Sequence, residues 1–141
     1  MVTSLIDRVF YRLSKSRLVE SIPIATENGN HEDIHRVVEA LRLTKAYDPV
    51  RFRMVLKEIK RIWVRLLPGH SAEFEPDTRT CLLDQRFLLS NPVEVSASAI
   101  IHEATHGRLL RRNIPYTEEI RHRVEGICLG RELAFAQDSE W

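Results

Sequence analysis

The clearest helix signals in the chain lie between Asn91 and Pro115, and they constrain the rest of the fold most. Asn91 can cap a helix N-terminus, Pro92 suits the first helical position, and a glutamate stands in the first turn. Residues 97–101 are small or apolar, which indicates that this part of the helix is buried. The sequence therefore predicts a helix over residues 92–111. The strand signals of the chain lie in the segments before this helix.

Three short segments before this helix have strand character. Residues 62–66 alternate and are rich in β-branched and aromatic side chains, and residues 71–75 and 78–83 follow after Pro-containing turns. Residues 85–89 either extend the third strand or turn away from it. The sequence thus predicts a short sheet of three or four strands, built from residues 61–88.

Apolar residues at helical spacing predict further helices on both sides of this core. Their expected ranges are 3–18, 32–46, 49–60 and, after a cap at Thr117, 117–136. Asp48-Pro49 is a cap followed by a proline at the first helical position, and residues 21–31 are expected to form a loop. The expected fold class is α+β: one domain over residues 1–141, with a helical part (1–60) before the sheet and the later helices (61–136).

Composition excludes several classes of protein. With 141 residues, 43% of them hydrophobic, the chain is long enough for one packed core, and the longest apolar runs are too short to span a membrane. Two cysteines and no apolar leader lead us to expect a reducing, cytoplasmic setting. A net charge of +1 favours no polyanionic partner, although residues 51–65 are basic and form either a solvated face or a contact surface.

Residues 102–106 read His-Glu-Ala-Thr-His within the helix predicted over residues 92–111. Two imidazoles four residues apart, His102 and His106, project from one face and can bind one Zn²⁺. Glu103 could then act as the general base that takes a proton from a water molecule acidified by the metal. The alternative interpretation is a pair of ordinary histidines on a helix surface.

A catalytic zinc needs a third protein ligand and one open position. The helix predicted after Thr117 offers Glu125, and His122 lies one turn earlier on the same face. We expect Glu125 to be the third ligand, with His122 as the competing choice and as a candidate donor to a developing oxyanion. Cys128 is either a packed small hydrophobe or a thiolate ligand.

With these residues the chain resembles the zincin metallopeptidases, and among them the gluzincins, over about residues 63–136. The histidine-glutamate motif on one helix and a glutamate on the next carry the resemblance. It implies that His102, His106 and Glu125 bind one Zn²⁺ per chain and that Glu103 is the general base. It also implies a short sheet before the motif, whose edge strand borders the substrate cleft.

The expected function is zinc-dependent hydrolysis of peptide bonds in a protein or peptide substrate, and no membrane partner is expected. A chain this small has a shallow cleft, so a partner protein could complete it. The alternative is a metal-binding module without turnover, which serves recognition or regulation. Glu103 favours catalysis, because a purely structural zinc site has no use for a carboxylate beside its histidines. A nucleic-acid-binding role ranks third.

Overall fold

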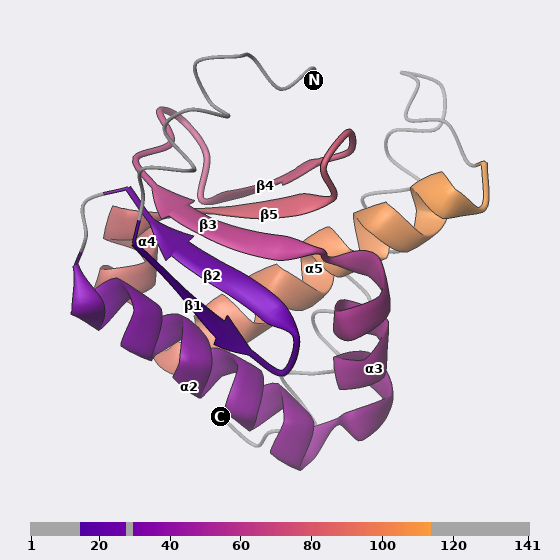
Figure 1. Ribbon diagram of the computed structural model, residues 1–141, viewed down its shortest axis with the longest axis horizontal. Helices are drawn as coiled ribbons and strands as arrows, with labels where there is room; N and C mark the ends of the chain where they lie inside the picture. The colour runs from indigo at the N-terminus through magenta and orange to yellow at the C-terminus, as the bar shows by residue number, and fades with distance from the viewer. Residues whose placement is uncertain (1–14, 28–29, 114–141) are drawn as a thin grey trace.

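The computed structural model describes residues 15–27 and 30–113 (Figure 1). Five strands form one sheet: β1 (Lys15–Val19), β2 (Ile22–Thr26), β3 (Arg61–Arg65), β4 (Ala72–Glu75) and β5 (Thr80–Asp84). Four helices accompany it within the described ranges: α2 (His31–Tyr47), α3 (Pro49–Glu58), α4 (Gln85–Ser90) and α5 (Val93–Arg111). The fold is therefore mixed α+β, and none of these helices is long and apolar enough to cross a membrane.

The sheet has parallel strands at its centre and antiparallel strands at its edges. Its order is β1-β2-β3-β5-β4, in which β2, β3 and β5 run parallel to one another. The edge strands β1 and β4 run antiparallel to β2 and β5. The helices α2 and α3 connect β2 to β3, as a crossover between parallel strands requires (Figure 1).

One face of the sheet packs against α2, α3 and α5, which also pack against one another (Figure 1). Alternate strand residues point into this layer, including Ile24, Ile62 and Cys81, all of which are fully buried. The intervening residues point to the opposite face, where Ala25, Trp63, Leu67 and Leu82 form a second buried cluster. The helix layer fixes α5 against the sheet, and the histidine motif lies on α5.

Most of the predicted elements are confirmed. The helices expected over 32–46, 49–60 and 92–111 are α2, α3 and α5, each displaced by one or two residues at an end. Asp48 caps α3 as predicted, since its carboxylate accepts a hydrogen bond from the Arg51 amide at 3.0 Å. The three expected strands are β3, β4 and β5, and residues 85–90 turn away as the short helix α4.

The prediction for the first part of the chain was wrong where the structure describes it. Residues 15–19, expected at the end of a helix over 3–18, form β1, and residues 22–26, expected in a loop, form β2. The sheet consequently has five strands rather than three or four. Pro23 is tolerated because pairing of β2 with β3 begins only at Ile24, so no bond in that ladder needs an amide hydrogen from the proline. Residues 1–14 and the helix expected over 117–136 lie outside the described residues.

The cap predicted for α5 is also wrong in detail. Pro92 precedes the first helical residue, and no side chain caps this N-terminus. The Asn91 amide instead donates to the Phe87 carbonyl oxygen at 2.9 Å, so it closes the preceding helix α4. The side chain of Asn91 therefore bonds to the end of α4 and is not used to cap the beginning of α5.

Candidate metal centre

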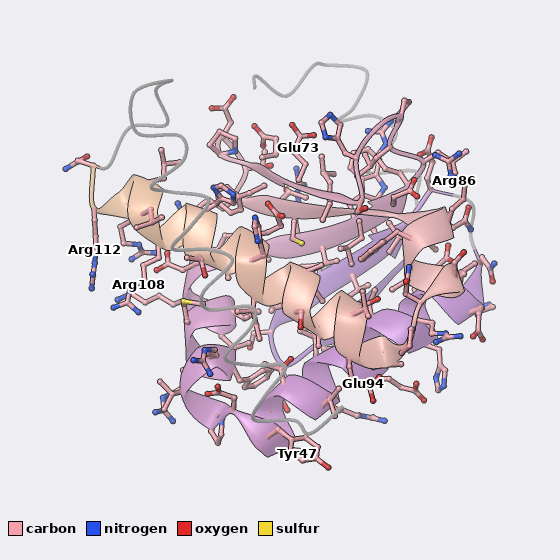
Figure 2. The ribbon with its side chains drawn as sticks, turned by 180° about the vertical axis from the view of Figure 1, so that it is seen from behind. Tyr47, Glu73, Arg86, Glu94, Arg108 and Arg112 are labelled. Atoms are coloured by element: carbon pink, nitrogen blue, oxygen red, sulfur yellow. The ribbon has the colours of Figure 1, made fainter. Side chains whose placement is uncertain are left out.

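The helix α5 crosses one face of the sheet and passes beside the edge strand β4 (Figure 2). Glu94 lies near its beginning, while Arg108 and Arg112 lie at its other end (Figure 2). The histidine motif occupies the middle of the helix, where the neighbouring residues Ile101 and Ala104 are fully buried in the core. Core packing therefore fixes the backbone that carries the motif.

His102 and His106 are both half-buried, and their rings lie close together. The ring centroids are 5.0 Å apart, and the ring planes are inclined by 55°. Zinc lies about 2 Å from each ligating nitrogen, hence about 3 Å from each ring centroid, and its tetrahedral angle then requires centroids about 5 Å apart. The observed separation fits the two residues to a shared Zn²⁺.

Glu103 lies on the neighbouring face of α5, which is turned toward the sheet. Only 7% of the residue is exposed, although it adjoins two half-exposed histidines. Its negative charge contributes to the raised pKa of the Cys81 thiol in β5. Four residues further along the same face, Gly107 lies against Phe74 of β4. Glu103 is thus held at the junction of the helix and the sheet, one residue from the first histidine.

Cys81 is the one cysteine of the described residues, and it is free and fully buried. Burial first, and the negative charge of Glu103 second, raise the pKa of this thiol well above its ordinary value. The side chain is therefore a neutral thiol that adds no charge beside Glu103. Cys128, the other cysteine, lies outside the described residues.

Among the described residues, β4 is an edge strand of the sheet, and it is in contact with α5. The Asp84 amide donates to the Ser71 carbonyl oxygen at 2.9 Å, and bonded and non-bonded pairs alternate along an antiparallel ladder. The alternation makes Ala72 and Phe74 members of non-bonded pairs. Their backbone N–H and C=O groups consequently point away from β5, toward the free edge.

The residues predicted to supply a third metal ligand lie outside those that the structure describes. Glu125 and His122, predicted as ligand and as competing ligand or oxyanion donor, lie beyond residue 113. Within residues 15–27 and 30–113, no three His, Cys, Asp or Glu side chains come together as a metal-binding group. The choice between Glu125 and His122 stays a prediction.

The basic stretch of residues 51–65 does not form one exposed helix face. It is divided between α3 and β3, and much of its charge has partners within the protein. The Arg65 guanidinium lies 3.3 Å from the Glu27 carboxylate and stacks over the Trp63 ring at 4.3 Å. The Arg61 guanidinium donates to Thr80 at 2.7 Å. This arrangement favours a structural role for these charges.

Sequence reasoning missed a second group of residues beside the motif, centred on Arg79 and Glu58. Arg79 lies in the turn between β4 and β5, and its guanidinium contacts both Glu58 and the backbone of Gly107. Glu58 is the one acidic residue in the otherwise basic stretch 51–65, and this contrast was the available signal. It gave no indication of the partner, which is 21 residues away.

Comparison of the chain with profiles of known families, with curated proteins and with solved structures finds no match in any of the three. The case for a metal centre consequently rests on the motif and on the geometry of α5, β4 and β5.

Proposed function

We propose that this protein is a zinc-dependent peptidase of the zincin type. The observation that carries the proposal is the pair of half-buried imidazoles on α5, with ring centroids 5.0 Å apart. The antiparallel edge strand β4 alongside the same helix supports it. These features are the ones that a metal-assisted hydrolase of extended peptides would need.

In this proposal His102 and His106 hold the metal, and Glu125 or His122 supplies the third ligand. Zn²⁺, when bound, supplies a Lewis acid that polarises a carbonyl group and lowers the pKa of water toward neutrality. Packing of α5 on the core fixes the backbone that carries both imidazoles. Little ordering of this backbone would then be needed on binding.

Glu103 is the proposed general base. Its carboxylate would accept a proton from the attacking water and later donate it to the nitrogen of the departing amine. The position of Glu103 between α5 and the sheet keeps it close to the histidines without making it a ligand. The neutral thiol of Cys81 next to it places no competing negative charge on that side.

The free edge of β4 is the proposed substrate-binding element. The backbone groups of Ala72 and Phe74 would pair with an extended peptide, as in other cases where a peptide adds a strand to a sheet. Main-chain pairing tolerates many sequences, so specificity would depend on the side chains around the edge. The proposed substrate class is therefore an extended protein or peptide segment.

The alternative is a metal-binding module without turnover. The burial of Glu103 is the observation that favours it, because a general base must be reached by water. Zinc binding through His102 and His106 would be common to both functions, so metal content does not distinguish them. The behaviour of Glu103 does.

The experiment compares the zinc-loaded native protein with Glu103→Gln on a peptide library prepared from a proteome digest, with mass spectrometry counting new termini. We expect Glu103→Gln to keep its zinc and its fold while the rate of cleavage falls by about 100-fold or more. Glu94→Gln, in the first turn of the same helix, is the matched control and should cleave as the native protein does. Equal cleavage by native and Glu103→Gln proteins, or none by either at full zinc occupancy, would refute the peptidase in favour of the binding module.

A further inference from the structure

We infer that Arg79 is a positioning residue for the metal centre, fixed in place by the buried carboxylate of Glu58. The inference rests on the proposed function, because it concerns how His106 is held for the metal. Of the proposed ligands that the structure describes, His102 and His106, neither side chain is a hydrogen-bond partner of Arg79. It acts through the backbone of Gly107, the residue that follows His106 in α5.

The guanidinium of Arg79 joins three elements of the fold. Its Nε donates to the Glu58 carbonyl oxygen at 3.0 Å, and its Nη2 donates to the Glu58 carboxylate at 2.8 Å. The same Nη2 donates to the Gly107 carbonyl oxygen at 3.2 Å. The rigid fork of an arginine holds these partners in one geometry, which a flexible lysine would not do.

The backbone of Arg79 shows that this position is maintained against a local cost. Its φ of 53° lies in the left-handed region, where residues other than glycine are strained. The Arg79 carbonyl oxygen also accepts a hydrogen bond from the Lys60 amide at 2.9 Å. Side chain and backbone together thus fix the turn between β4 and β5 to the end of α3.

Glu58 is the buried residue that holds the Arg79 guanidinium in place. Only 2% of the residue is exposed, so its carboxylate needs charged hydrogen-bond donors to offset the cost of removing it from water. Arg79 is one donor, and the Arg111 Nε is the other, at 2.9 Å from the same oxygen. A buried, doubly paired carboxylate restricts the guanidinium more than an exposed one would.

Gly107 lets the turn and the edge strand approach the helix directly after His106. A Cβ at this position would lie 3.0 Å from Arg79 Nη2 and 3.0 Å from Phe74 Cζ. The guanidinium carbon of Arg79 in turn lies over the Phe74 ring, 5.3 Å from the ring centroid. The contact therefore sets the distance between the second histidine and the strand proposed to bind substrate.

Arg111 offers a matched control, because its side chain shares Glu58 with Arg79 but donates no hydrogen bond to Gly107. Its other hydrogen bond goes to the Lys57 carbonyl oxygen at 3.2 Å. Replacing either arginine by glutamine removes one ion pair from the same carboxylate. Only the Arg79 variant also removes a side-chain hydrogen bond from the Gly107 carbonyl oxygen, next to His106.

The test measures the affinity of the full chain for Zn²⁺ by chelator competition, together with the visible absorption spectrum of the Co²⁺-loaded protein. We expect Arg79→Gln to weaken zinc binding by about tenfold, the lower end for residues that orient ligands, and to change the cobalt spectrum. Arg111→Gln should lower the melting temperature but leave both readouts as in the native protein. Should Arg79→Gln not fold, Arg79→Lys keeps a charge for Glu58 and is expected to show the same weakening.

Unchanged zinc affinity and cobalt spectrum in the Arg79 variant would overturn the inference alone and leave the metal site intact. Equal weakening by Arg79→Gln and Arg111→Gln would also overturn it, since general destabilisation would then explain both. A native protein that binds no zinc would overturn the proposed function, and the inference with it.

Discussion

Replacing Gly107 by alanine tests the close approach of β4 to α5. In an ordinary helix interior, alanine is more stable than glycine by about 0.8–1.0 kcal/mol. Here the new Cβ would lie 3.0 Å from Phe74 Cζ and 3.1 Å from Phe74 Cε1, closer than normal van der Waals contact. Overpacking of this kind costs about 1–3 kcal/mol. We therefore expect Gly107→Ala to lower the free energy of unfolding by about 1 kcal/mol, despite its better helix propensity.

The assay is urea denaturation of four proteins: the native chain, Gly107→Ala, Phe74→Leu and the double variant. Leucine lacks the ring atoms that the new Cβ would meet, so the alanine should cost less in the Phe74→Leu protein, with a coupling energy of about 1 kcal/mol. For a chain of this size, the single Gly107→Ala variant should melt about 3 °C lower than the native protein. If Gly107→Ala stabilised the native chain by the ordinary helix increment, the contact between Phe74 and the helix would be disproved.

Three further predictions concern single side chains. The Asp84 carboxylate is partly buried, which opposes ionisation, but hydrogen bonds from the Leu67 and Phe87 amides outweigh this effect and hold its pKa below the ordinary value. Asp84→Asn should therefore lower the free energy of unfolding by about 1–2 kcal/mol at pH 7. The difference from the native protein should shrink below about pH 4, where the aspartate takes up its proton. An undiminished difference in melting temperature at pH 3 would count against this. Cys81 should resist iodoacetamide at pH 8 in the native state, because burial and the charge of Glu103 raise the pKa of its thiol, and rapid alkylation in peptide maps would show otherwise. Glu125→Ala should reduce zinc affinity more than His122→Ala, and the reverse order would make His122 the third ligand.

The sequence predicted the elements whose signals are local. Asp48-Pro49 marked the start of α3, and the apolar run before the histidine motif marked a buried helix. The hairpin of β1 and β2 was missed because its two-residue turn, Glu20-Ser21, has positive φ values of 49° and 74° without the glycine or asparagine that usually indicates such a turn. The strands on either side can stabilise such a turn, and its own residues then carry no recognisable sequence signal.

In the candidate site, too, some features follow from local sequence spacing and others depend on tertiary packing. The spacing of His102 and His106 sets them on one helix face, and Glu103 must then lie about 100° away from the first of them. Which of these faces meets the sheet depends on packing, and the structure shows that it is the face of Glu103 and Gly107. The ion pair of Arg79 with Glu58 depends on tertiary contacts between α3 and the turn before β5, which no local pattern encodes.

The most direct test of the central claim is the zinc content of the purified full chain, measured by elemental mass spectrometry after dialysis against zinc and then against buffer. We expect one zinc per native chain and less than a tenth of that in the double variant His102→Ala/His106→Ala, with circular dichroism showing both proteins folded. A native chain without zinc, or a double variant that keeps one zinc per chain, would contradict the assignment of these two histidines as metal ligands.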